Sequence, residues 1–119
     1  MSQPKNNIKS VTLFGRKITI CIVSESKLRK VSESKPDETV YGYYEDISRT
    51  VYLNETLQPE QLRTVLLHEL MHAILSIGGV SNILSEKVEE SICNATEAFI
   101  DLFNDSNFLG FICNKSCNK

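Results

Sequence analysis

The stretch that decides the fold of this chain runs over residues 59–77, PEQLRTVLLHELMHAILSI. Its apolar residues recur at helical spacing and fall on one face of a single long helix. That face consists of Leu62, Leu66, Leu70, Ala73 and Ile77. His68 and His72, the two histidines of the chain, lie roughly opposite this face. The helix therefore has an apolar face that can pack in a core and an opposite face whose imidazoles need a partner outside that core.

The sequence also marks the ends and the surroundings of this helix. Thr56 is a candidate N-terminal cap, and Pro59 is favourable in a first turn. Gly78-Gly79 is expected to end the helix. Val65 and Leu75 flank the histidine face, so a further element should cover that side and leave a cleft with the imidazoles on its wall.

The two histidines belong to the motif His68-Glu69-Leu70-Met71-His72, which is H-E-x-x-H. On a helix this motif places two imidazoles one turn apart, where both can bind zinc, with a carboxylate that reaches a metal-bound water. The pattern predicts a zinc-dependent hydrolase, and among hydrolases it favours a peptidase. In that chemistry Zn²⁺ activates the water and polarises the scissile carbonyl, and Glu69 moves the proton to the leaving amine.

Zinc at such a site needs a third protein ligand and one open position. The candidates lie at the start of a second predicted helix over residues 85–104, which Ser85 caps: Glu86, Glu89 and Glu90. The expected buried stripe of this helix is Val88, Ile92, Ala95, Phe99 and Leu102. Glu89 is nearest to that stripe, whereas Glu86 and Glu90 are one turn apart, so that one can bind metal while the other orients an imidazole. The alternative is that all three are solvated acids stabilised by the helix dipole.

The segments before the motif predict two β-hairpins. Residues 10–14 and 17–23 form the first, and residues 39–45 and 49–54 form the second. Residues 24–35 are expected to be a short polar helix or a loop. The fold class is therefore α+β: a small twisted antiparallel or mixed sheet packs on the HExxH helix, and the glutamate helix closes the site. An edge strand, 39–45 or 49–54, would accept an extended peptide by strand addition.

Composition narrows the class of protein further. The 119 residues with a net charge of −2 suit one small domain, assigned to residues 10–107 between a disordered segment 1–9 and a tail 108–119. No basic stripe indicates nucleic acid, no apolar run approaches a membrane span, and no signal peptide is evident. We therefore expect a cytoplasmic protein whose partner is a peptide or protein substrate, with no nucleic acid and no membrane.

Four cysteines are expected to be reduced thiols. Cys21 and Cys93 fall at apolar positions of a strand and a helix and are expected in the core. Cys113 and Cys117 form a C-x3-C pair in the tail, which is a weak metal-binding signal.

Val65-Leu-Leu-His-Glu-Leu-Met-His-Ala-Ile-Leu75, preceded by a hairpin and followed by a Glu-bearing helix, resembles the gluzincin branch of zinc metallopeptidases. It is most similar to their minimal members, the minigluzincins and the short HExxH proteins of phages and mobile elements, and distantly like the ImmA/IrrE-type peptidases. The resemblance covers roughly residues 40–104. It implies a zincin-like fold, with Zn²⁺ bound by His68 and His72 and with Glu69 as general base.

The resemblance also implies a third ligand from the second helix. In gluzincins this Glu is often followed, four residues later, by an acid that hydrogen-bonds a histidine ligand. Glu86 and Glu90 have that spacing, so the resemblance implies Glu86 as ligand and Glu90 as the acid behind an imidazole. Glu90 and Glu89 are the alternative third ligands. The family's transition-state-stabilising residue has no clear counterpart among Tyr41, Tyr43, Tyr44 and Tyr52.

Besides a metal-free structural domain, two other functions fit the same residues. The first is a zinc-stabilised binding module of a phage or mobile element that does not cut its partner. The second is a latent, zymogen-like peptidase whose apolar tail segment 108–113 occupies the cleft.

Overall fold

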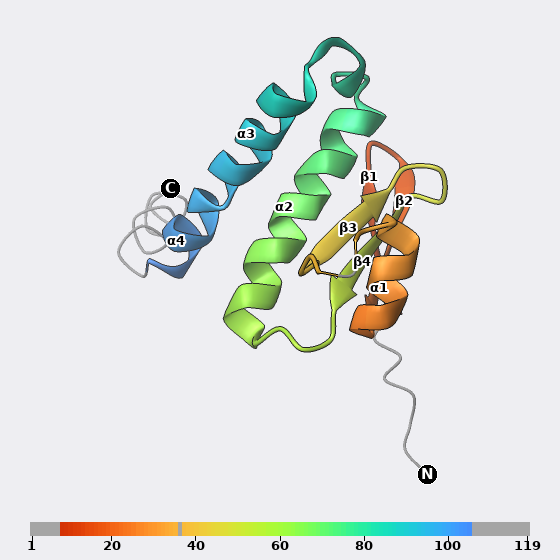
Figure 1. Cartoon of the computed structure of the whole chain (residues 1–119). Coiled ribbons are helices and arrows are strands. Elements are labelled where there is room, and N and C mark those ends of the chain that lie inside the picture. Colours follow the sequence, from red (N-terminus) through yellow and green to blue (C-terminus); the bar gives the residue numbers. More distant parts are fainter. Residues whose placement is uncertain (1–7, 36, 106–119) are drawn as a thin grey trace.

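The computed structural model describes residues 8–35 and 37–105, which form a four-stranded mixed sheet flanked by helices (Figure 1). The strands are β1 (Ile8–Leu13), β2 (Arg16–Val23), β3 (Gly42–Glu45) and β4 (Thr50–Asn54). Their order in the sheet is β1-β2-β4-β3, with β2 and β4 parallel and the other pairs antiparallel. This confirms the predicted α+β class. It also decides the edge strand: β3 is at the edge, and the alternative choice, 49–54, is wrong because β4 lies between β2 and β3.

Both predicted hairpins form, with small shifts at their ends. β1 and β2 are joined by Phe14 and Gly15, whose φ values of 52° and 74° give the positive-φ turn that suits a two-residue hairpin. β1 begins at Ile8, so the predicted boundary of the disordered segment at residue 9 is wrong, and residues 8 and 9 belong to the sheet. Residues 1–7 lie outside the described part. Between the hairpins, α1 (Glu25–Ser32) is a helix capped by Ser24, which excludes the loop alternative.

The core lies between the sheet and α2 (Pro59–Ile77). Its buried side chains are Ile18, Val51, Leu53 and Ala73. The whole predicted apolar face of the helix takes part, because Leu62, Leu66, Leu70 and Ile77 pack against this cluster as well. α2 is thereby fixed on the sheet with its histidine face turned away from the core.

The ends of α2 confirm one prediction and correct another. Gly78 follows the last helical residue, and Gly79 has a φ of 79°, as expected for a glycine that ends a helix. Thr56 is not the N-terminal cap: its amide and hydroxyl both donate to Asn54 Oδ1. Gln58 holds the cap position instead, and its backbone N–H donates to Gln61 Oε1 at 3.2 Å.

The second long helix is divided into α3 (Glu86–Thr96) and α4 (Ala98–Asn104), preceded by the short helix η1 (Ser81–Ile83). Ser85 caps α3 as predicted, accepting from Val88 N–H at 3.1 Å. α2 lies between the sheet and α3, so α3 covers the histidine face (Figure 1). In the described part of the chain, no helix has the length and apolar character needed to cross a membrane.

The predicted buried stripe of this helix is wrong except at Ile92, which is partly buried. Val88, Phe99 and Leu102 are 47%, 48% and 40% exposed, and Ala95 is exposed as well. The residues of α3 that are buried are Cys93 and Thr96. The face of α2 that α3 covers carries His68 and His72. Buried imidazoles require polar or small partners, so an apolar stripe of α3 cannot pack there.

Candidate metal centre

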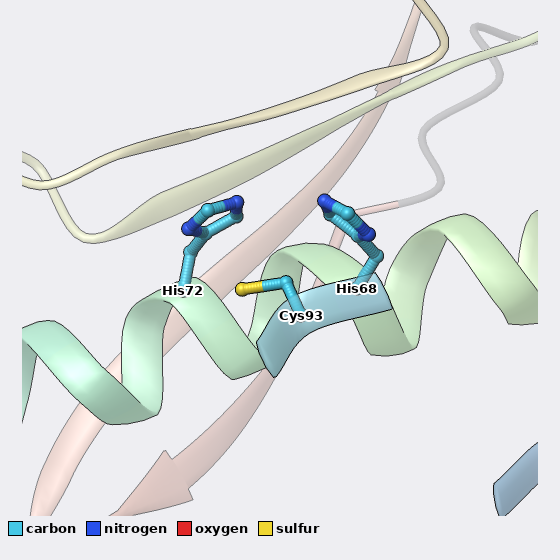
Figure 2. A group of neighbouring side chains, drawn as sticks. All are labelled: His68, His72 and Cys93. Atoms are coloured by element: carbon cyan, nitrogen blue, oxygen red, sulfur yellow. The ribbon is translucent and has the colours of Figure 1, made fainter. Parts of the chain in front are cut away.

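The two histidines of the motif meet on one side of α2. Their ring centroids are 5.1 Å apart with an interplanar angle of 63°. Figure 2 shows both rings projecting from the same side of the helix, with Cys93 of α3 close to them. The side chains of His68 and His72 are only 13% and 23% exposed. The expectation of a covered histidine face is therefore confirmed, and the covering element is α3.

Glu90 contacts both imidazoles at once. Its Oε2 lies 2.9 Å from His68 Nε2, and its Oε1 lies 3.2 Å from His72 Nε2. The side chain of Glu90 is nevertheless 52% exposed. Two Nε2 atoms and one carboxylate thus converge at a place that remains open to solvent.

The opposite nitrogens of the two rings are held by other glutamates. His72 Nδ1 lies 2.7 Å from Glu89 Oε2, and His68 Nδ1 lies 3.0 Å from Glu97 Oε2. Each of the four ring nitrogens therefore faces a carboxylate oxygen from α3 or from the residue that follows it. Such outer carboxylates fix the orientation and tautomer of metal-binding imidazoles.

These donors fit a zinc ion. Two ligands about 2.1 Å from a tetrahedral metal lie roughly 3.4 Å apart. The nitrogen–oxygen separations at Glu90, 2.9 and 3.2 Å, are somewhat shorter than this spacing. Two imidazoles with a carboxylate form the His2Glu set of catalytic zinc sites, in which a fourth position stays open. The half-exposed position of Glu90 is compatible with such an open site.

Cys93 adds a sulfur donor at the same place. Its Sγ and one ring nitrogen from each histidine lie within 4.8 Å of one another, so His68, His72 and Cys93 also form a possible metal-binding group. The thiol is buried, and burial, followed by the negative charges of Glu90, Glu89 and Glu69, raises its pKa to about 12. Without a metal this group is a protonated thiol, which is a weak ligand.

Glu69 is buried beside the histidines, at 9% exposure. Burial raises the pKa of its carboxyl, although the neighbouring charges of His72 and His68 and a hydrogen bond from the Tyr44 backbone lower it in part. A buried carboxylate with a raised pKa is a stronger base than an exposed one. This is the environment expected for a group that accepts a proton.

The remaining predicted site residues are Glu86 and the tyrosines, and they lie either on the His68 side or on the His72 side of the centre or further away. Glu86 lies in the first turn of α3 and lines a cavity with His72, Glu89 and Glu90, but in the described structure the acids that contact the imidazoles are Glu89, Glu90 and Glu97. Of the four tyrosines, Tyr41 lies on the His68 side, Tyr43 and Tyr44 lie on the His72 side, and Tyr52 lies in β4.

Two hollows flank Glu69 along β3. A cavity of about 550 Å³ is lined by residues that include Glu38, Tyr41, Gly42, His68 and Glu97. A second cavity, of about 370 Å³, includes Tyr43, Tyr44, Asp46, His72 and Ser76. A Cβ on Gly42 would meet Val65 Cγ1 at 2.6 Å and Glu69 Cγ at 3.1 Å. The absence of a side chain at Gly42 is therefore what lets the edge strand lie against the motif.

Comparison with known families agrees with this geometry. A sequence model of the Peptidase M78 family, described as the IrrE N-terminal-like domain, matches residues 23–100. The match covers more than half of the 119 residues and includes both α2 and α3, and the chain belongs to this family. It is a peptidase-type family whose members are usually zinc-dependent, which confirms the predicted distant relationship to ImmA/IrrE-type peptidases. Among the curated proteins and the solved structures, no match was found.

Sequence reasoning missed two members of this centre. Glu97 lies seven residues after Glu90, which is two helical turns on the same face, so the spacing could have indicated it. Cys93 was expected to be a core residue, and it is buried, but its place beside the imidazoles was not foreseen. Cys21 is only partly buried. Cys113 and Cys117 lie outside the described residues, as does segment 108–113, on which the hypothesis of a latent peptidase depends.

Proposed function

We propose that this protein is a zinc-dependent metallopeptidase that hydrolyses peptide bonds, with His68, His72 and Glu90 as metal ligands and Glu69 as general base. The observation that carries the proposal is the convergence of both Nε2 atoms on the Glu90 carboxylate, at 2.9 and 3.2 Å, beside a buried glutamate of the same HExxH helix. Membership of a peptidase-type family supports the reaction class.

Glu90 is preferred over the other candidates for the third ligand because of its contacts. It reaches both imidazoles, whereas Glu89 pairs with a nitrogen that faces away from this point of convergence. Glu86, the choice implied by the gluzincin spacing, lines the adjoining cavity instead. Cys93 is the alternative donor, because its Sγ and one ring nitrogen of each histidine lie within 4.8 Å of one another.

In the proposed mechanism, His68, His72 and Glu90 would hold a Zn²⁺ ion, which would act as a Lewis acid toward the water and the scissile carbonyl. Glu69 accepts the proton of the attacking water and delivers it to the leaving amine nitrogen. Its buried position beside the two histidines suits both transfers. Glu89 holds the His72 ring through Nδ1, so that Nε2 remains directed at Glu90.

The proposed substrate is an extended peptide that lies along β3. A free sheet edge offers backbone N–H and C=O groups for strand addition, and β3 is such an edge. Because Gly42 lies against Glu69, a peptide paired with this strand would pass close to the general base. The two cavities on either side of Glu69 would receive side chains on the two sides of the scissile bond.

A zinc-stabilised binding module remains the second candidate. Tyr44 is placed near the centre, but its hydroxyl donates to Asp46 Oδ1 at 3.3 Å and so is already engaged. With its hydroxyl engaged in this way, Tyr44 is not free to stabilise a transition state, and the protein could hold zinc without efficient hydrolysis. The two functions differ in whether bound peptides are cut.

The proposal is tested by measuring zinc content and peptide cleavage on the same protein. Purified protein should bind one zinc per chain and digest a broad peptide library, and a chelator should stop the digestion. His68→Ala and Glu90→Ala should lose zinc, whereas Cys93→Ala and Glu86→Ala should keep it. Loss of zinc from Cys93→Ala, with retention in Glu90→Ala, would assign the third ligand to sulfur. Zinc binding without any cleavage would favour the binding module.

A further inference from the structure

Glu97 occupies an unusual place beside the metal centre. It stands between the last residue of α3 and the first residue of α4, with φ −61° and ψ −25°. Its N–H bonds to Asn94 C=O at 3.1 Å, so the chain continues in a helical turn through this position. Glu97 therefore lies on the same face as Glu90, two turns further along, next to His68 rather than His72.

The contact with His68 is well defined. Glu97 Oε2 lies 3.0 Å from Nδ1, while Nε2 of the same ring faces Glu90 at 2.9 Å. An imidazole that binds a metal through Nε2 carries its proton on Nδ1, and that N–H then donates to the carboxylate. The contact thus selects both the tautomer and the rotation of the ring.

The spacing from Glu90 to Glu97 is seven residues, whereas the gluzincin pattern predicts an acid four residues after the metal ligand. Four residues after Glu90, where the gluzincin spacing would place an acid, the chain has Asn94, which is exposed. The acid that reaches the imidazole comes three residues later, from the junction between the two helices. The junction therefore brings a carboxylate to His68 as well as joining the two helices.

We infer that Glu97 is a positioning residue for the metal centre, which holds His68 with Nε2 directed at the metal. This inference rests on the proposed function for its metal. The side chain of Glu97 is 40% exposed, and ion pairs at such positions contribute little to folding. A carboxylate behind a histidine ligand instead affects metal affinity, typically by about 10- to 100-fold.

The test is the zinc affinity of the full chain, measured by competition with a fluorescent chelator. Glu97→Ala should weaken zinc binding by about 10- to 100-fold. Glu97→Gln, which keeps an acceptor oxygen but no charge, should recover part of that loss. Asp101→Asn is the matched control, because it removes an exposed carboxylate one turn further on and should bind zinc like the unchanged protein.

A second measurement follows the proton itself. In nitrogen-edited NMR spectra of the zinc-bound protein, the His68 Nδ1 proton should be protected in the unchanged protein and in Glu97→Gln. It should be lost by exchange with water in Glu97→Ala. A purely structural role would not produce this recovery by Gln. If Glu97→Ala does not fold, Glu97→Gln still tests the inference through its weaker zinc binding.

Two results would overturn the inference. The first is zinc affinity in Glu97→Ala equal to that of the Asp101→Asn control. The second is an unchanged protein that binds no zinc, which would remove the proposed function as well. A protein that binds zinc but cuts no peptide contradicts only the proposed hydrolysis, because the readouts for Glu97 are zinc affinity and the ring proton.

Discussion

The two faces of α2 are packed by opposite kinds of interaction. Toward the sheet, the helix contributes Ala73 to a cluster of buried apolar side chains with Val51 and Leu53. Toward α3, the same helix presents His68 and His72 to carboxylates, while apolar side chains of α3 such as Val88 remain exposed. One helix is thus held on one side by burial of apolar surface and on the other by pairs of polar groups.

This difference has a physical consequence for how the molecule is assembled. Burial of apolar area stabilises the α2–sheet side whether or not a ligand is present. Partly exposed histidine–carboxylate pairs contribute little by themselves. A metal that binds residues of both α2 and α3 would therefore stabilise the second side much more than the first.

The largest expected effect concerns Glu69, which lies on α2 at the border between the two sides. Glu69→Gln removes the general base, so the rate of peptide cleavage should fall by about 10²- to 10⁴-fold. Zinc content should stay unchanged, because the ligands are other residues. Both quantities can be measured on one preparation, and a variant that cleaves at the original rate would exclude Glu69 from the proton transfer.

The next prediction compares the stability lost when an apolar side chain is shortened in the sheet, on one side of α2, and in α3, on the other side. Leu53 is 1% exposed, so Leu53→Ala should lower the free energy of unfolding by about 2–5 kcal/mol. Val88 is 47% exposed, so Val88→Ala should change it by less than about 0.5 kcal/mol. Denaturant titration measures both values. Equal losses for the two variants would show that α3 uses its apolar residues in packing after all.

Removal of zinc should separate the two sides further. With free zinc at about 100 times its dissociation constant, a single site stabilises the folded protein by about 2.7 kcal/mol. A chelator should therefore increase amide hydrogen exchange mainly in α3, and much less in β2, β4 and α2. Exchange that increases equally in the sheet and in α3 would contradict the idea that only one side depends on metal.

The same contrast explains which features could be predicted from the sequence. The hairpins and α2 were predictable because strand alternation and the face from Leu62 to Ile77 report apolar burial directly. The HExxH motif predicted both histidines and Glu69 as site residues, because its spacing matches one helical turn. Each of these features depends on a local pattern within a single element.

The second helix was harder to interpret because its buried face is not apolar. Val88, Phe99 and Leu102 suggested a stripe, yet the residues facing α2 include Glu89, Glu90 and Cys93. These residues contact α2, and the rotation of one helix relative to another cannot be predicted from a single sequence. The prediction of a cap at Thr56 was wrong for a local reason: its amide and hydroxyl donate to Asn54, two residues earlier, and Gln58 holds the cap position.

A smaller effect is expected at the contact between the edge strand and the motif. Gly42→Ala places a Cβ 2.6 Å from Val65 Cγ1, so β3 must shift away from α2. This overpacking should lower the free energy of unfolding by about 1–2 kcal/mol. Cleavage should weaken as well, because the strand that would hold the peptide moves relative to Glu69. An unchanged unfolding curve would show that Val65 yields without a shift of the strand.

The smallest effect is a pH dependence of the protein without metal. Burial raises the pKa of Glu69 in the folded state, so the neutral form is favoured there. The resulting contribution to stability is complete below the ordinary carboxyl pKa and is lost as the pH rises through the raised value. In the presence of a chelator, Glu69→Gln should therefore be more stable than the unchanged protein at neutral pH, and this advantage should vanish in acid. Thermal unfolding at several pH values measures the difference. If the variant gave no advantage at any pH, the Glu69 carboxylate would be better solvated than its place between β3 and the histidines indicates.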